Sequence, residues 1–266
     1  MSVSSPSDKV LADESDGIGR ITFNNPRRHN AMSLEMWQAL GDVLDQFSAS
    51  ASLRVLILAG AGGKAFVSGA DISEFETRRS SAEQQEIYES AFDRAQDALA
   101  ACKEPVIAMI GGYCVGGGLA LALNADIRIA SRNSKFAIPA AKLGLGYGYD
   151  SIKTLTSIVG PAFAKDILFS ARMLEADEAL RIGLVHRMVE SGELDKVTQA
   201  YAERLVANAP LTIRAIKAAV NETVYDPGQA SPEYVDKLVA ACFESEDYKE
   251  GREAFMNKRK PVFKGR

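Results

Sequence analysis

The chain has 266 residues, 47% hydrophobic and 25% charged, a composition that excludes a disordered or fibrous protein and suits one large domain, with or without an appendage. Its 31 basic and 35 acidic residues give a net charge of −4, so neither nucleic acid nor an anionic membrane is an expected partner. Three cysteines without metal-binding spacing, only two histidines, and no apolar run of signal-peptide or membrane-span type lead us to expect a cytoplasmic protein without a metal site.

The first hundred residues predict alternating strands and helices. Residues 17–24 alternate apolar and polar side chains as a strand does, and the helix that follows has Ser33 as its N-cap. A continuous apolar run at 54–59 predicts a buried strand, and a polar helix is expected at about 82–101. This alternation predicts an α/β fold with mostly parallel strands.

Residues 103–130 (KEPVIAMIGGYCVGGGLALALNADIRIA) contain the most informative segment. A buried strand is followed by Gly116-Gly117-Gly118 and a helix-forming run. The first N–H groups of a helix lack intrahelical partners and carry the positive end of its dipole, so they suit an oxyanion or a phosphate. Tight packing between strand and helix is the alternative explanation of the three glycines. No Gly-Lys-Ser/Thr follows, which argues against a phosphate loop.

Beyond residue 130 the pattern changes from α/β to helical. The expected elements are strands at 127–130, 135–138 and 184–189, a glycine-rich loop at 139–149, and helices at 151–159, 162–169 and 176–181. From residue 195 onward the pattern is helical, with breaks at 208–210 and 226–228. We therefore predict a core at 1–195 and a C-terminal helical region at 196–266.

Four segments, taken together, resemble the crotonase (enoyl-CoA hydratase/isomerase) superfamily. They are GRITFNNP with Asn30-Ala31, AFVSGADI at 65–72, GGYCVGGG with DIRIA at 111–130, and KRKPVF at 258–263. The resemblance covers nearly the whole chain in order. It implies a crotonase-like ββα spiral core, a C-terminal helical trimerisation region, a homotrimer or a hexamer of two trimers, and an acyl-CoA substrate. Coenzyme A would be carried as part of that thioester, so no separate cofactor is expected.

The resemblance also implies the site residues. Two backbone amides, those of Ser68 and Gly117, would hold the thioester oxygen as it becomes an enolate. Arg28 and His29 would meet the pantetheine or the phosphates, and the C-terminal residues would approach coenzyme A, from this subunit or a neighbouring one. The binding residues implied in this way are Arg28, His29, Gly69, Ala70, Asp71, Ile72, Gly116, Lys260 and Phe263.

The chain departs from the family where hydratases carry two glutamates. Those positions are Ala120 and Ala140, and alanine can neither activate water nor protonate carbon. The expected function is therefore a lyase such as a decarboxylase in preference to an efficient hydratase. An acyl-CoA hydrolase and a non-catalytic acyl-CoA-binding protein are the alternatives.

Two polar residues are candidates to replace the glutamates. Tyr147 falls where decarboxylases acting on methylmalonyl-CoA-like substrates carry a tyrosine, although those enzymes have a histidine where this chain has Ala70. Packing over the acyl pocket is the alternative role of Tyr147. Asp150 lies where hydrolytic members use an aspartate, and capping of the next helix is its alternative role.

Overall fold

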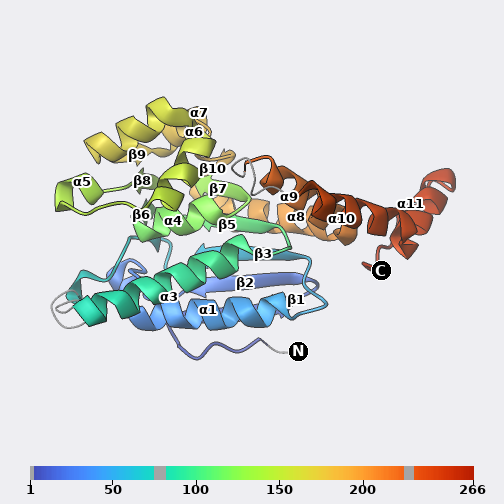
Figure 1. The fold of residues 1–266 in the computed structure, drawn as a ribbon, viewed down its shortest axis with the longest axis horizontal. Coiled ribbons are helices and arrows are strands. Elements are labelled where there is room, and N and C mark those ends of the chain that lie inside the picture. Colours follow the sequence, from blue (N-terminus) through green and yellow to red (C-terminus); the bar gives the residue numbers. More distant parts are fainter. Residues whose placement is uncertain (1–2, 75–81, 225–230) are drawn as a thin grey trace.

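A computed structural model describes residues 3–74, 82–224 and 231–266, and within them it has two β-sheets flanked by helices (Figure 1). The larger sheet has six strands in the order β1-β2-β3-β5-β7-β10, parallel except for the β1–β2 hairpin. Its strands are β1 (Val10–Ser15), β2 (Ile18–Phe23), β3 (Val55–Gly60), β5 (Val106–Ile110), β7 (Ile127–Ser131) and β10 (Arg187–Val189). The predicted α/β class with mostly parallel pairing is confirmed.

Strand β1 was not expected from the sequence. Its residues, VLADES, have no apolar alternation to mark a strand, and it forms because Val10 pairs with Phe23 across an antiparallel hairpin. Asp16 and Gly17 turn the chain with φ of 52° and 78°. Pairing with a neighbour, and not local propensity, makes this segment a strand.

Helices cover both faces of the large sheet. On one face lie α1 (Leu34–Ser48) and α3 (Ala82–Ala100), whose apolar sides join the main core. The Oγ of Ser33 accepts a hydrogen bond from the Met36 N–H at 3.3 Å, which confirms the predicted N-cap. On the other face lies α8 (Leu194–Val206), where Leu194 and Ala202 pack against apolar side chains of β2, β3, β5 and β7. Helix α8, which begins at the predicted division, thus packs on the large sheet, and the division itself stays a prediction.

The smaller sheet, in the order β4-β6-β8-β9, lies beside the large one. Its strands are β4 (Ala65–Val67), β6 (Tyr113–Val115), β8 (Lys135–Ala137) and β9 (Leu174–Glu175). The first three are parallel, and β9 is antiparallel to β8. Three of these four strands were missed by the sequence analysis because elements of two or three residues are too short to show a period.

The remaining helices and turns connect these layers. Helix α4 (Gly117–Asn124) follows β6 directly and is buried almost throughout. The other elements are α5 (Ala140–Leu143), α6 (Tyr149–Ser170), α7 (Ala176–Arg181), and the 3-10 turns η1 (Pro26–Arg28), η2 (Ile72–Glu74) and η3 (Ser191–Glu193). Gly160, at φ 74°, and Pro161 kink α6 where the sequence predicted two helices.

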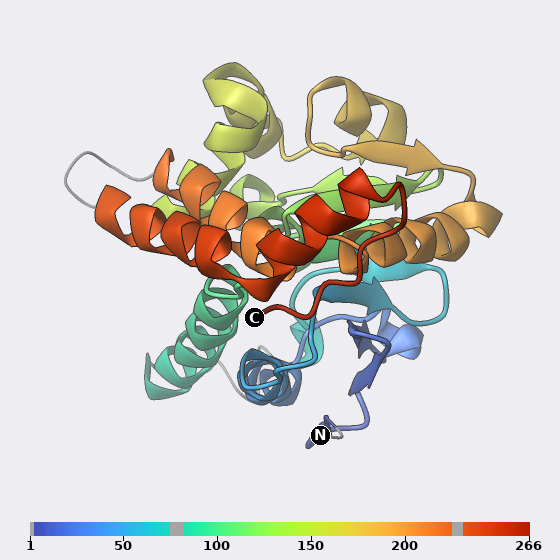
Figure 2. The same ribbon diagram turned by 90° about the vertical axis from the view of Figure 1, so that its right-hand side faces the viewer.

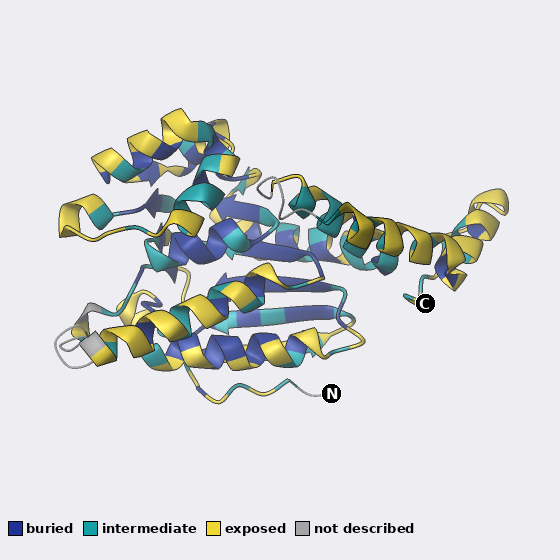
Figure 3. Ribbon diagram, viewed as in Figure 1, coloured by how far each residue is buried: buried dark blue, intermediate teal, exposed yellow. Residues whose placement is uncertain are grey.

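Three C-terminal helices project from this body as an arm (Figures 1 and 2). They are α9 (Pro210–Glu222), α10 (Pro232–Glu244) and α11 (Glu246–Met256). The predicted break before Pro210 is confirmed, and the one at 226–228 lies outside the described residues. The arm is largely exposed whereas the strands of the body are buried (Figure 3). Among the described residues, no helix combines the length and the apolar character that crossing a membrane requires.

Candidate functional site

Two glycine-containing turns meet where β4 and β6 end. The strands are parallel neighbours, with Val67 paired to Cys114, so the turns that follow them emerge at the same edge of the sheet. A β-carbon built on Gly116 would lie 3.8 Å from the Cα of Gly69. The two turns therefore adjoin each other, and glycine at both positions permits their positive φ angles, 111° at Gly69 and 54° at Gly116.

The first turn is fixed by Met32. The Met32 N–H donates to the Gly69 carbonyl at 2.8 Å, and the Met32 carbonyl accepts from the Asp71 N–H at 2.9 Å. In such a parallel bridge the residue between the two partners directs its own N–H to the other side. That residue is Ala70, and no acceptor for its N–H is found within the described part of the chain.

This geometry corrects the assignment of Ser68. Its N–H donates to the His29 carbonyl at 3.2 Å, so the donor is already occupied within the protein. The sequence motif located this turn, but the bridge to Met32 decides which of its N–H groups faces outward. In this structure the available amide of the first turn is that of Ala70.

The three glycines of the second turn have different roles. Gly116 has φ 54° and ψ −118°, a conformation that a side chain would strain, and it lies at the N-cap of α4. Gly117 is the first residue of that helix, and its N–H has no acceptor among the described residues. A β-carbon on Gly118 would lie 2.1 Å from the Val67 carbonyl oxygen. Tight packing thus explains Gly118, and the positive φ explains Gly116, whose own N–H donates to the Ala137 carbonyl at 2.9 Å. Gly117 is the residue that presents an unpaired N–H at the start of the helix.

A charged group lies beside the first turn. Arg28 Nη1 is 2.8 Å from Asp71 Oδ1, and that oxygen also accepts hydrogen bonds from the Ser73 N–H at 3.0 Å and the Ser73 hydroxyl at 2.7 Å. Burial opposes ionisation of Asp71, but the hydrogen bonds from Ser73 and the charge of Arg28 outweigh it and lower the pKa of the carboxyl group. Arg28 itself remains about half exposed.

The other predicted residues of this edge lie close by. His29 is exposed, and its ring centroid is 6.0 Å from that of Tyr113, in an edge-to-face contact. Ile72 begins η2 directly after Asp71. The structure therefore brings together the predicted binding residues at 28–29, 69–72 and 116.

The positions of the family's glutamates are apolar in three dimensions as well. Ala120 is 4% exposed on α4, and Ala140, half-buried, begins α5. Tyr147 packs partly buried against the main core, and burial raises the pKa of its hydroxyl to about 12. This hydroxyl is therefore neutral near pH 7, and it has no hydrogen-bond partner among the residues that are described.

Asp150 differs from Tyr147 in its surroundings. It is exposed in the first turn of α6, and Gly148, not Asp150, is the N-cap. Burial is the main cause of the raised pKa of Asp93, and the negative charge of Asp150 raises it further. Asp150 thus lies near acidic residues of α3. Its position in the first turn of α6 suits a negative charge, because the start of a helix carries the positive end of the dipole.

Lys260 and Phe263 lie in another part of the chain. The Phe263 ring packs on α11, 3.5 Å from a β-carbon built on Gly251. The tail is also held at the amino end of β3, where Arg54 Nη2 donates to the Lys264 carbonyl at 2.8 Å. The glycine turns lie near the opposite end of β3, where Gly60 abuts Ala65. Within this chain, Lys260 and Phe263 therefore lie away from the two glycine turns.

Trp37 is one of the buried residues of α1. In the structure its indole ring lies against Gly117, because a β-carbon on Gly117 would be 3.3 Å from Trp37 Cζ2. The signal available in the sequence was the single tryptophan in the chain, on the buried face of a helix. Helical periodicity shows that such a residue is buried but not what it contacts.

Comparisons with known proteins agree with this architecture. Residues 13–266 match the family model described as enoyl-CoA hydratase/isomerase. The chain is 33% identical to a short-chain-enoyl-CoA hydratase of Clostridium acetobutylicum, over 94% of this chain and 95% of the relative. It is 34% identical to a carnitinyl-CoA dehydratase of Salmonella typhi, with 94% and 95% covered. A crystal structure of an enoyl-CoA hydratase/carnithine racemase from Magnetospirillum magneticum superimposes with a TM-score of 0.93 at 40% identity, covering 98% of this chain and 97% of that one.

Proposed function

This chain belongs to the enoyl-CoA hydratase/isomerase family, and on that premise we propose that it binds an acyl-CoA thioester and stabilises the enolate formed from it. The membership confirms the resemblance predicted from the sequence, together with the crotonase-like fold class. The hydratase and dehydratase names of the relatives describe those proteins, and the reaction of this chain follows from its own residues.

The amides of Ala70 and Gly117 form the proposed oxyanion hole. The observation that carries the proposal is that these two N–H groups lie on adjoining turns and lack protein acceptors in the described residues. Gly117 adds the positive end of the α4 dipole. A preorganised donor of this kind contributes about 2.7–4 kcal/mol to stabilising a developing oxyanion.

Coenzyme A is proposed to bind along the first turn, at the binding residues 28–29 and 69–72. Arg28 would contact a phosphate while Asp71 and Ser73 hold the guanidinium group in place. The exposed His29 would lie beside the same part of the ligand. No separate cofactor is part of the proposal, because the thioester brings coenzyme A with it.

The proposed reaction is decarboxylation. The bond between the α-carbon and a carboxylate breaks and carbon dioxide leaves. The electron pair of the broken bond stays on the thioester and forms the enolate. The α-carbon then takes up a proton. Such a reaction needs enolate stabilisation and an orienting group but no strong base, which fits alanine at positions 120 and 140. Tyr147 supports this choice, since a partly buried neutral hydroxyl donates a hydrogen bond to a carboxylate.

The same two alanines also support a second candidate, a non-catalytic acyl-CoA-binding protein. A hydrolase that uses Asp150 as base or nucleophile has weaker support, because that residue is exposed in a helical turn beside other acidic groups.

Turnover measurements on purified protein separate these candidates. We expect carbon dioxide release from a methylmalonyl-CoA-like thioester, slow hydration of crotonyl-CoA, and no release of free thiol. Rapid hydration of crotonyl-CoA would contradict the argument from Ala120 and Ala140. Thiol release would favour hydrolysis, and tight binding of coenzyme A without turnover of any thioester would favour the binding protein.

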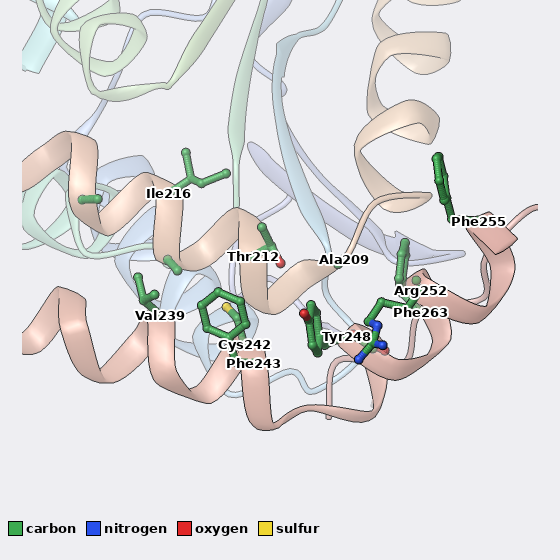
Figure 4. Close-up of a pocket in the computed structure, with 14 residues that line it drawn as sticks. Ala209, Thr212, Ile216, Val239, Cys242, Phe243, Tyr248, Arg252, Phe255 and Phe263 are labelled. Carbon is green, nitrogen blue, oxygen red and sulfur yellow. The ribbon is translucent and has the colours of Figure 1, made fainter.

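Assembly into a homotrimer or a hexamer stays part of the proposal. The arm has a groove of about 650 Å³ between α9, α10 and α11, lined mainly by apolar side chains (Figure 4). Ile216 and Phe243 on its walls are 57% and 61% exposed, so the groove suits a protein contact. A neighbouring tail would also allow Lys260 and Phe263 to reach coenzyme A from another subunit. Analytical ultracentrifugation tests this, and a monomer at micromolar concentration would contradict it.

A further inference from the structure

A buried tryptophan and a partly buried phenylalanine lie directly behind the second glycine turn. Trp37, on α1, is 1% exposed and supports the Cα of Gly117 with the edge of its indole ring. Phe92, on α3, packs edge-to-face on the same indole, with ring centroids 4.9 Å apart and an interplanar angle of 77°. The start of α4 therefore rests on a rigid aromatic surface.

The same tryptophan is connected to the first turn. Trp37 Nε1 donates to the hydroxyl of Tyr88 at 2.8 Å, and this hydroxyl donates in turn to the Met32 carbonyl at a longer 3.5 Å. That carbonyl also accepts the Asp71 N–H, and the Met32 N–H fixes the Gly69 carbonyl. One short chain of contacts thus runs from Gly117 through Trp37, Tyr88 and Met32 to the residues on both sides of Ala70.

We propose that Trp37 and Tyr88 are positioning residues that set the spacing between the Ala70 and Gly117 amides. The inference rests on the proposed function, since it concerns the same two donors. Neither side chain touches the thioester in this proposal. They act by holding two segments of main chain that are separated by 46 residues. These segments are paired as strands only before the two donors, where Val67 lies opposite Cys114.

Donor spacing matters as well as donor presence in such a site. An oxyanion is stabilised only when both N–H groups lie about 2.7–3.1 Å from the position that the oxygen will occupy. A displacement of about 1 Å can cost on the order of 100-fold in rate. Removing the Tyr88 hydroxyl cuts the link between the turns while the ring continues to fill the core.

Acetoacetyl-CoA provides a direct test, because its enolate absorbs in the near ultraviolet and an oxyanion hole raises the enolate fraction of the bound molecule. The variants are Tyr88→Phe and Trp37→Phe. The matched control is Tyr201→Phe, whose ring packs on the other face of the large sheet under Arg187. Affinity is measured by calorimetry and enolate fraction by absorbance, well below the unfolding temperature of each variant.

For Tyr88→Phe we expect the bound enolate-to-keto ratio to fall about 10-fold with affinity within about threefold of wild type, since binding contacts remain and donor spacing is lost. Trp37→Phe should act in the same direction, and it decides the question if Tyr88→Phe does not fold. The control should leave the ratio unchanged. A raised ratio in wild type that persists in both variants would overturn the inference. No raised ratio in wild type would instead overturn the proposed oxyanion hole.

Discussion

The two sides of the candidate site are built differently. The side that would face the thioester carbonyl consists of main chain at the ends of buried strands, with Gly69 and Gly116 on adjoining turns. The side that would face the acyl group consists of α5, the following loop and the start of α6, where Leu143 is 60% and Tyr149 71% exposed. Under the proposed function, carbonyl polarisation would therefore depend on the fold itself, whereas the reaction would depend on side chains that can change without disturbing the core.

The largest effect is expected when acid and base groups are restored to the acyl-facing side. The double variant Ala120→Glu/Ala140→Glu should increase hydration of crotonyl-CoA by about 10²–10⁴-fold, because general acid–base catalysis typically contributes that much. The measurement is loss of the enoyl absorbance. Ala141→Glu, at the exposed neighbouring position, is the control and should produce no gain. If the double variant folds and gains nothing, the carbonyl-facing side does not polarise a thioester.

The second prediction tests the carbonyl-facing side through its packing. Gly118→Ala should lower the free energy of unfolding by about 3 kcal/mol, because the new β-carbon would meet the Val67 carbonyl oxygen at 2.1 Å. Gly146→Ala in the acyl-facing loop meets no atom within 4 Å and should change it by less than about 0.5 kcal/mol. Equal denaturant midpoints for the two variants would remove the contrast between the two sides.

The third prediction concerns the polar group of the acyl-facing side. Tyr147→Phe should lower turnover about 10-fold with little change in KM, since only a hydroxyl is lost. Because burial raises the pKa of Tyr147 to about 12, its proton is retained throughout the neutral range, and the contribution of the hydroxyl should be constant from pH 6 to 9. Tyr149→Phe, at an exposed position, is the control. A wild-type rate that falls with an apparent pKa near 8, absent in Tyr147→Phe, would contradict the assignment.

The smallest effect is expected at the ion pair beside the first turn. Asp71→Asn should cost about 0.5–1 kcal/mol of unfolding free energy near pH 7, because Arg28 is half exposed and its interaction is screened. The folded-state pKa of Asp71 lies below its ordinary value of 3.8. Its stabilisation is thus present above pH 4 and is lost as the pH falls through the folded pKa. Urea midpoints of the two proteins should therefore converge on acidification, and a constant difference from pH 7 to 3 would count against the ion pair.

Local pattern was sufficient for much of the fold. The Ser33 cap, the buried strand at 54–59, helix α7 and the break before Pro210 follow from side-chain period and capping chemistry, and the structure has them. Strands β1, β4, β6 and β9 did not follow, because they are held by pairing with distant residues. The division at residue 195 and the oligomer stay predictions.

The sequence by itself determined that Gly116-Gly117-Gly118 lead into a helix and that the positions of the family's glutamates hold alanine, because glycine, alanine and apolar runs are local properties. Only the tertiary structure decided which amide of the first turn is free. Its orientation depends on a bridge from Met32 to Gly69 and Asp71, and that pairing exists only in the folded chain. The same reason explains why Trp37 could be predicted as buried but not as the residue that supports Gly117.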